Sequence, residues 1–121
     1  MPEKPRILVV DDDGPILLLM RSVLREFGFE AVSAASGQQA IEEAQRTTPD
    51  LILLDRNMPG MSGDETLRAL RAIPALAKTP VLILSGEPIE PNELAAMGAN
   101  GSVLKPFDVQ NLVETIRKYL E

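Results

Sequence analysis

Residues 51–55 of this chain are Leu-Ile-Leu-Leu-Asp, a run of four apolar residues that ends in a carboxylate. Residues 7–10 and 81–84 form two further runs of the same character. Because these runs are continuously rich in Val, Ile and Leu, without the alternation of a half-exposed strand, they predict strands buried on both faces of a parallel sheet. Residues 30–34 and 102–104 are shorter or more polar, which favours strands at the edges of that sheet.

The segments between these runs have helical periodicity and carry capping residues. The first helix is predicted to begin after Asp13 and to reach about Phe27, where Gly28 can adopt the left-handed conformation that ends a helix. Three later helices have predicted N-caps at Ser36, Ser62 and Asp108. The fourth helix is predicted to be short, because prolines delay its start and Gly98 ends it.

Five strands that alternate with five helices predict an α/β doubly wound domain. A Rossmann-like sheet, with strand order 3-2-1, would bury the polar second strand and leave residues 51–54 at an edge. The flavodoxin-like order 2-1-3-4-5 instead places the three apolar runs in the middle of the sheet. We therefore predict a flavodoxin-like (βα)5 fold with a parallel five-stranded sheet, and a single domain over residues 1–121.

The composition excludes several classes of function. The chain has neither cysteine nor histidine, which rules out disulfides, thiolate or imidazole metal sites and histidine bases. The formal net charge of −6 argues against direct binding to nucleic acid. No apolar run is long enough to span a membrane, and residues 1–6 lack the apolar region of a signal peptide, so we expect a cytoplasmic protein.

Polar side chains follow four of the predicted strands at their carboxyl ends. They are Asp11, Asp12 and Asp13 after the first strand, Asp55 after the third, Ser85 after the fourth and Lys105 after the fifth. Open α/β sheets bind ligands at this edge, near the point where the strand order reverses. Several carboxylates cannot all stay ionised there without a bound cation or a raised pKa. Since only oxygen ligands are offered, the expected cation is Mg²⁺, with Mn²⁺ as an alternative.

Each of these positions alone also fits a purely structural role. Asp13 suits a helix cap, Ser85 suits a turn, and Lys105 suits a solvated residue of an edge strand. Separate structural roles would not require these side chains to converge on one edge of the sheet. Their coincidence at four strand ends therefore favours a functional site.

Four segments of the chain match a known pattern in order and in spacing. They are Val9-Val10-Asp11-Asp12, residues 55–63 (Asp-Arg-Asn-Met-Pro-Gly-Met-Ser-Gly), Ser85-Gly86 and Lys105-Pro106-Phe107. Together they resemble the receiver domain of two-component response regulators, and the resemblance covers nearly the whole chain. It implies phosphorelay signalling by a phosphoacceptor switch that catalyses only its own phosphorylation and dephosphorylation.

The resemblance also assigns roles at the reacting centre. It implies that Asp55 takes a phosphoryl group from a phosphohistidine on a sensor histidine kinase or a phosphotransfer domain. Asp12, Asp55 and the backbone carbonyl of Asn57 would bind Mg²⁺. Asp11 would help mainly through water, and Lys105 would pair first with the carboxylate and then with the phosphoryl oxygens.

A conformational switch is implied next to this centre. Ser85 would donate its hydroxyl to the phosphoryl group and move the face formed by residues 85–105. Asn57 and Glu87 would tune the hydrolysis of the acyl phosphate, although both also suit solvated loop positions. The resemblance further implies a cis peptide bond between Lys105 and Pro106.

The expected output surface departs from the family pattern. An output domain or effector would bind the face formed by residues 85–121, where a homodimer would also form on phosphorylation. The family commonly has an aromatic residue three positions before the lysine, but this chain has Ser102 there, and its one tyrosine is Tyr119. An aromatic switch is therefore not expected.

Two alternatives remain. A Mg²⁺-dependent phosphohydrolase with an aspartyl nucleophile would use Asp11, with Asp13 two positions on, but the loop after Asp55 would then have no explanation. The other is a docking module that has lost phosphotransfer, an idea that Ser102 supports and the complete acidic set opposes.

Overall fold

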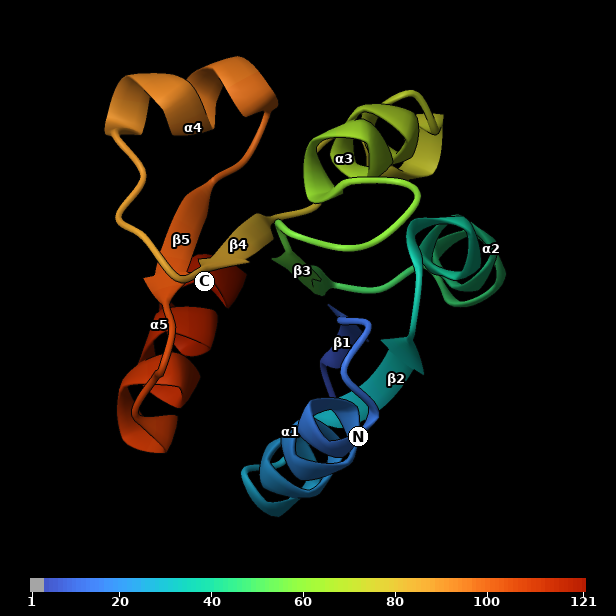
Figure 1. Ribbon diagram of the computed structural model, residues 1–121. Coiled ribbons are helices and arrows are strands. Elements are labelled where there is room, and N and C mark those ends of the chain that lie inside the picture. Colours follow the sequence, from blue (N-terminus) through green and yellow to red (C-terminus); the bar gives the residue numbers. More distant parts are fainter. Residues whose placement is uncertain (1–3) are drawn as a thin grey trace.

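The computed structural model describes residues 4–121. The expectation that residues 1–6 lack a signal peptide therefore lies partly outside the described residues. Five parallel strands form one sheet in the order β2-β1-β3-β4-β5, which confirms the predicted flavodoxin-like topology (Figure 1). The strands are β1 (Arg6–Val10), β2 (Glu30–Ala34), β3 (Leu51–Asp55), β4 (Val81–Ser85) and β5 (Gly101–Leu104).

Helices cover both faces of the sheet. They are α1 (Gly14–Glu26), α2 (Gly37–Thr47), α3 (Gly63–Arg71), α4 (Pro91–Met97) and α5 (Val109–Leu120). One buried cluster joins α1 and α5 to the sheet, and a second joins α2 and α3 to its other face, with α4 at the margin (Figure 1). No helix within residues 4–121 is long and apolar enough to cross a membrane.

The three apolar runs supply both halves of the core. In β1, Ile7 and Val9 belong to the cluster under α1 and α5, whereas Leu8 and Val10 belong to the cluster under α2 and α3. Every residue of β3 and β4 is buried. Alternate residues of a strand point to opposite faces, so a strand covered on both sides must be apolar throughout. This is why the runs showed no alternation.

The predicted helix caps are present. The Asp13 side chain accepts a hydrogen bond from Ile16 N at 3.3 Å, and Asp108 accepts one from Gln110 N at 3.1 Å. Ser62 begins α3 in a complete capping box. The box predicted at Ser36 is only half formed, because the Gln39 side chain accepts from Ala35 N instead. Gly28 and Gly98 adopt the left-handed conformation at the ends of α1 and α4, as predicted.

The segment from β3 to β5 departs from expectation in two small ways. A single 3₁₀ turn, Pro74–Leu76, follows α3 and was not predicted. The last strand begins at Gly101, one residue earlier than expected. The short fourth helix is confirmed: α4 has seven residues, none of them buried.

Gly63 fixes the distance between the end of β3 and the start of α3. A methyl group at this position would lie 2.5 Å from the carbonyl oxygen of Asp55 and 2.7 Å from Cα of Arg56. Both are backbone atoms that cannot move aside cheaply. Gly63→Ala is therefore expected to lower the free energy of unfolding by about 2 kcal/mol, as measured by denaturant titration.

Gly14→Ala is the matched control for this prediction. Gly14 also begins a helix, but a methyl group there would meet nothing within 4 Å. Its replacement should leave the domain unchanged or stabilise it by about 0.5 kcal/mol, because alanine restricts the unfolded chain. Equal losses at both glycines would show that the backbone contact at Gly63 is not the cause.

Candidate functional site

Three carboxylates meet at the carboxyl ends of β1 and β3. One ligand oxygen from each of Asp11, Asp12 and Asp55 lies within 4.8 Å of the other two. Asp11 and Asp55 are only 1% and 5% exposed, while Asp12 faces solvent. The strand order makes β1 and β3 neighbours, so the predicted convergence of these side chains is confirmed.

Lys105 reaches the same carboxylates from the end of β5. Its Nζ atom lies 3.1 Å from Oδ1 of Asp55 and 3.2 Å from Oδ2 of Asp11. The peptide bond between Lys105 and Pro106 is cis, as predicted. One ammonium is therefore shared between two nearly buried carboxylates.

Burial and charge act against each other on the ionisable groups of this site. Burial raises the pKa of Asp55, and the neighbouring Asp11 charge raises it further, against the opposing hydrogen bond from Lys105. Burial alone would lower the pKa of Lys105, but its hydrogen bonds to Asp55 and Asp11 leave that pKa raised. The lysine is thus firmly charged, whereas ionised Asp55 is held at a cost in free energy.

The donor set fits a hard divalent cation. Three carboxylate oxygens gather with one ammonium, so three negative charges face a single positive charge. Oxygen-only sites of this kind suit Mg²⁺ or Mn²⁺ rather than zinc or copper. Asp11 is also oriented by the backbone, since its Oδ1 accepts a hydrogen bond from Asp13 N at 3.0 Å. Asp13 itself caps α1 and does not join the carboxylate group.

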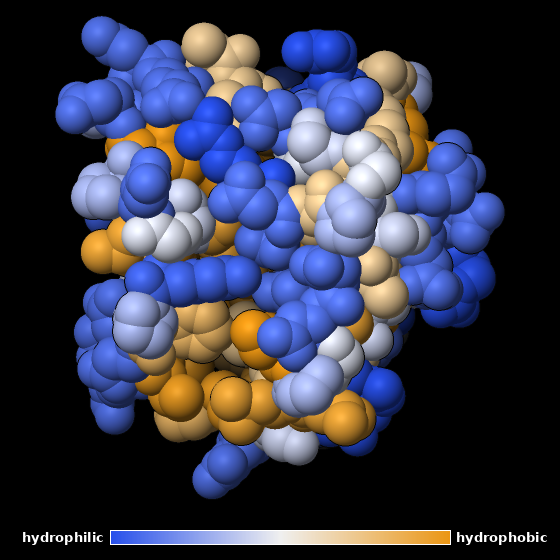
Figure 2. Space-filling model, in the orientation of Figure 1, coloured by the Kyte–Doolittle hydropathy of each residue, from blue (hydrophilic) through white to orange (hydrophobic). Residues whose placement is uncertain are grey.

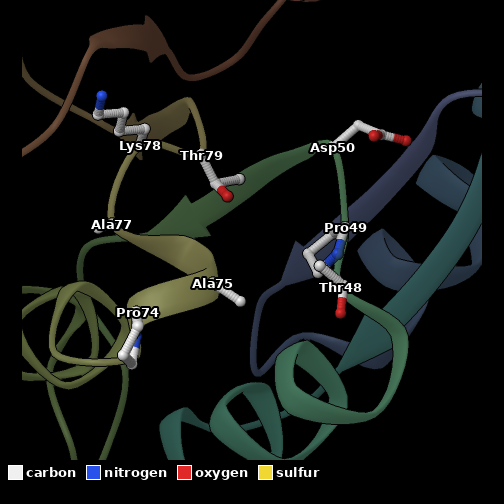
Figure 3. A pocket seen from close by; sticks show the side chains of 8 residues that line it. All are labelled: Thr48, Pro49, Asp50, Pro74, Ala75, Ala77, Lys78 and Thr79. Atoms are coloured by element: carbon white, nitrogen blue, oxygen red, sulfur yellow. The ribbon is translucent and has the colours of Figure 1, made fainter.

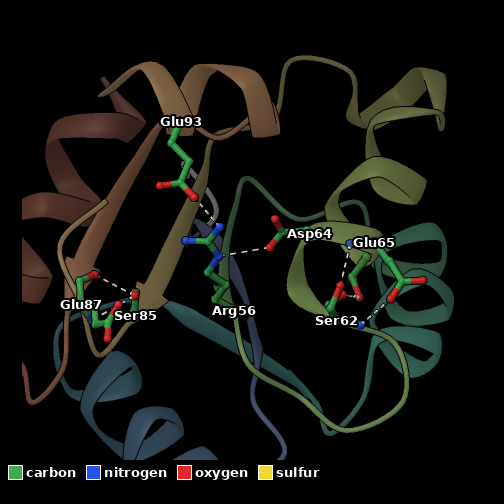
Figure 4. A network of polar contacts seen from close by, with 8 residues as sticks. Arg56, Ser62, Asp64, Glu65, Ser85, Glu87 and Glu93 are labelled. Carbon is green, nitrogen blue, oxygen red and sulfur yellow. Dashed lines mark hydrogen bonds and ion pairs between the residues drawn. The ribbon is translucent and has the colours of Figure 1, made fainter. Parts of the chain in front are cut away.

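A polar crevice lies between the loop after β3 and the loop after β4. Its lining residues are Arg56, Asn57, Ser85, Gly86 and Glu87. The Ser85 hydroxyl donates to the Glu87 carbonyl oxygen at 2.8 Å and accepts from Glu87 N at 3.1 Å (Figure 4). The predicted switch residues Asn57, Ser85 and Glu87 therefore border one space, with the Ser85 hydroxyl turned toward its own loop.

The family model for the response regulator receiver domain matches residues 7–117 of the chain. The chain belongs to this family. Sporulation initiation phosphotransferase F of Bacillus subtilis is 34% identical over 115 residues, which cover 95% of this chain and 93% of that protein. Transcriptional regulatory protein PrrA of Mycobacterium leprae is 38% identical over 118 residues, which cover 96% of this chain but only 50% of the relative's length.

Solved receiver structures agree with the fold of this chain. Chemotaxis protein CheY4 of Vibrio cholerae superposes with a TM-score of 0.90 at 34% identity, covering 96% of this chain and 98% of that one. The receiver domain of sensor histidine kinase PA1611 from Pseudomonas aeruginosa superposes with a TM-score of 0.87 at 25% identity, covering 97% and 98%. That structure has a magnesium ion coordinated in its active-site cleft.

Ser102 lies in β5, at the position where receiver domains commonly have an aromatic residue. Ser102 is partly buried and pairs with Ile83 of β4. The hydroxyl of Tyr119 donates to the carbonyl oxygen of Asn100 at 3.1 Å, next to the start of β5. The tyrosine therefore contacts the end of the strand opposite Lys105.

Sequence reasoning missed the role of Arg56 in this receiver domain. No site role was predicted for its side chain, which bridges two helices (Figure 4). Nε donates to Asp64 in α3 at 3.3 Å, and Nη2 donates to Glu93 in α4 at 2.6 Å. The sequence offered no local signal for this contact, because Glu93 is 37 residues away.

A second hollow lies at the far end of the sheet, where strands begin (Figure 3). Its lining residues are Thr48, Pro49, Asp50, Pro74, Ala75, Ala77, Lys78 and Thr79. The Asp50 carboxylate already accepts a hydrogen bond from Arg6 N at 2.7 Å. Asp50 and Lys78 are the two charged residues of this lining, so the hollow offers no converging set of reactive groups.

Proposed function

We propose that Asp55 is the phosphoacceptor of this receiver domain and takes its phosphoryl group from a phosphohistidine of a histidine kinase or phosphotransfer domain. The supporting observation is the 3.1 Å contact between nearly buried Asp55 and Lys105, in a crevice shared with two further carboxylates. Phosphoryl transfer requires positioning and neutralisation of charge more than covalent help from the protein. This arrangement supplies both.

In the proposed step, a carboxylate oxygen of Asp55 forms a bond to phosphorus. The bond from phosphorus to the imidazole nitrogen of the donor breaks, and its electron pair stays on that nitrogen. Lys105 lies within hydrogen-bonding distance of Oδ1 of Asp55, so its ammonium can follow the negative charge onto the phosphoryl oxygens. Its second contact, to Asp11, keeps it in place during transfer.

The proposed ligands of Mg²⁺ are Asp12 and Asp55, with the Asn57 carbonyl as a third and Asp11 acting mainly through water. One carboxylate oxygen from each of Asp11, Asp12 and Asp55 lies within 4.8 Å of the others, which supports these three residues. When bound, Mg²⁺ neutralises the carboxylates and the phosphoryl oxygens. Asp11 and Asp12 would hold it from the end of β1, and Asp55 would keep one oxygen for attack. The domain acts as a switch that catalyses only its own phosphorylation and dephosphorylation.

Ser85 is the proposed sensor of the phosphoryl group. Its hydroxyl donates to the Glu87 carbonyl in the present conformation, so a phosphoryl oxygen must compete for that donor. A charged acceptor forms a stronger hydrogen bond than a backbone carbonyl. The loop after β4 would then release Glu87 and shift. Asn57 and Glu87 line the neighbouring crevice, from which water would reach the acyl phosphate.

An exposed apolar patch beside the site suits a protein as phosphodonor. Leu19 on α1 is 56% exposed and lines a hollow whose walls are mostly apolar. Its lining residues are Ile16, Leu19, Lys105, Pro106 and Phe107. Figure 2 shows apolar side chains gathered in the lower part of this face, where Figure 1 has α1 and the turn between β5 and α5. Lys105 lines this hollow and contacts Asp55, so a donor protein bound to the patch would lie close to Asp55.

The phosphohydrolase alternative has less support from the site. It needs Asp13 as a free acid two positions after an Asp11 nucleophile, but Asp13 caps α1. Asp11 in turn is occupied by Lys105 and the Asp13 amide. The docking-module alternative leaves the shared lysine and the carboxylate grouping without a purpose.

Incubation with phosphoramidate tests the proposed function, because its P–N bond resembles that of phosphohistidine. With Mg²⁺ present, intact-protein mass spectrometry should show the gain of one phosphoryl group. Hydroxylamine, which cleaves acyl phosphates, should remove it, and chelation of the metal should prevent its formation. A label that survives hydroxylamine, or that forms equally well without Mg²⁺, would contradict an Mg²⁺-dependent aspartyl phosphate.

A further inference from the structure

Arg56 is tied to the reacting centre by its own backbone. It directly follows Asp55, its amide donates to the carbonyl oxygen of Leu84 in β4 at 3.1 Å, and its carbonyl accepts from Gly63 N at 3.0 Å. The position of its Cα is therefore fixed by β4 and by the start of α3. Its side chain must extend from this fixed point.

The side chain of Arg56 reaches α4 through a charged hydrogen bond. Nη2 lies 2.6 Å from Oε2 of Glu93, and Nε lies 3.3 Å from Oδ1 of Asp64 (Figure 4). The Arg56 side chain is 26% exposed, whereas the side chains of Asp64 and Glu93 are 40% and 47% exposed. We call these three residues, Arg56, Asp64 and Glu93, the Arg56 clamp. The clamp joins the loop after Asp55 to α3 and α4.

Few other contacts fix the position of α4. The helix has seven residues, no buried residue and no side-chain hydrogen bond at its N-cap. Leu94 and Met97 pack against the core cluster of α2 and α3, but both side chains are only partly buried. At its far end, the carbonyl of Gly98 accepts a hydrogen bond from Arg71. An element with so little buried surface opens easily, so one ion pair can change its open population measurably.

Arg56 directly follows Asp55 in the chain and also lines the polar crevice between the loops after β3 and β4, together with Ser85 and Glu87. Phosphorylation adds about −1.5 to −2 charges there. A guanidinium binds phosphate more strongly than it binds a half-exposed carboxylate, because the phosphate carries more charge and accepts two parallel hydrogen bonds. Glu93 would then lose its partner.

We propose that the Arg56 clamp holds α4 in place and that phosphorylation of Asp55 opens it by drawing the Arg56 guanidinium away from Glu93. The proposal rests on Asp55 as the phosphoacceptor and gives the domain a route to the face of residues 85–121 that needs no aromatic residue at position 102. In this proposal Arg56 controls the position of α4 and takes no part in the phosphoryl transfer itself.

Hydrogen exchange of the α4 amides, followed by mass spectrometry, tests the clamp. In the unphosphorylated domain, Glu93→Gln should speed exchange of residues 92–98 about two- to fivefold, the population change expected for losing one partly exposed ion pair. Glu90→Gln is the matched control, because it makes the same charge change at the N-terminus of the same helix. Within residues 4–121, the Glu90 side chain takes part in no ion pair, whereas Glu93 pairs with Arg56. It should leave exchange nearly unchanged.

Phosphorylation supplies the decisive comparison. Phosphoramidate and Mg²⁺ should speed α4 exchange in the wild-type domain by a similar factor, but add little in Glu93→Gln, whose clamp is already open. Unchanged exchange in Glu93→Gln, or a full additional effect of phosphorylation in that variant, would overturn the clamp.

The two proposals fail in different ways in this experiment. Intact mass reports whether the phosphoryl group is present, independently of exchange. A domain that takes no phosphoryl group contradicts the proposed function, while its unphosphorylated variants still test the ion pair. A fully phosphorylated domain whose α4 exchange does not respond contradicts the clamp alone.

Discussion

Asp55→Asn should abolish labelling by phosphoramidate completely, although the variant should fold. An asparagine amide is neutral and far less nucleophilic than a carboxylate, so no acyl phosphate can form. Intact mass spectrometry in the presence of Mg²⁺ measures this directly. Asp50→Asn is the matched control, since Asp50 stands just before β3 and Asp55 ends it, and this variant should be labelled like the wild-type domain.

The same variant should be more stable than the wild-type domain when Mg²⁺ is absent. The folded-state pKa of Asp55 is raised, mainly by burial, so the ionised carboxylate disfavours folding at neutral pH. Asparagine removes that cost. The gain in stability should disappear as the pH falls below the ordinary aspartate range, because Asp55 is then protonated in both the folded and unfolded states. Thermal unfolding at several pH values measures this dependence.

A different outcome would favour the phosphohydrolase alternative. Turnover of a small phosphomonoester that is lost in Asp11→Asn but retained in Asp55→Asn would assign the nucleophile to Asp11. Labelling of Asp55→Asn at the wild-type rate would falsify the proposed acceptor.

Most of the fold could be predicted because burial acts on whole segments. A strand covered on both faces must be apolar at every position, which identified β1, β3 and β4 and placed them in the middle of the sheet. The 3₁₀ turn after α3 was missed, because a three-residue element has no periodicity to detect. Its only sequence signal is Pro74, which equally suits a loop.

The carboxylate group could be predicted because topology alone brings strand ends together. Asp11 follows β1 and Asp55 ends β3, two strands that the flavodoxin-like order makes neighbours, and Lys105 follows β5. The ion pair from Arg56 to Glu93 could not be predicted, because it depends on where a loosely packed helix lies and on long side-chain rotamers. The hydrogen bond of Ser85 to Glu87 depends likewise on the local conformation of one loop.

Lys105→Met should change metal binding and phosphorylation in opposite directions. The substitution keeps an unbranched side chain but removes the ammonium that contacts Asp11 and Asp55. Without that charge, the carboxylates should bind Mg²⁺ about tenfold more tightly, because a dication no longer meets a neighbouring cation. Calorimetric titration with Mg²⁺ measures this affinity. Simple loss of structure could not produce such a gain.

The rate of labelling by phosphoramidate should nevertheless fall by about two to three orders of magnitude at saturating Mg²⁺, since one donor aimed at the developing phosphoryl charge is lost. Lys78→Met makes the same change in net charge far from the carboxylates, and should alter neither the affinity nor the rate. If Lys105→Met weakened Mg²⁺ binding and labelling together, the lysine would serve only to build the site. Opposite signs would show instead that its charge acts during transfer.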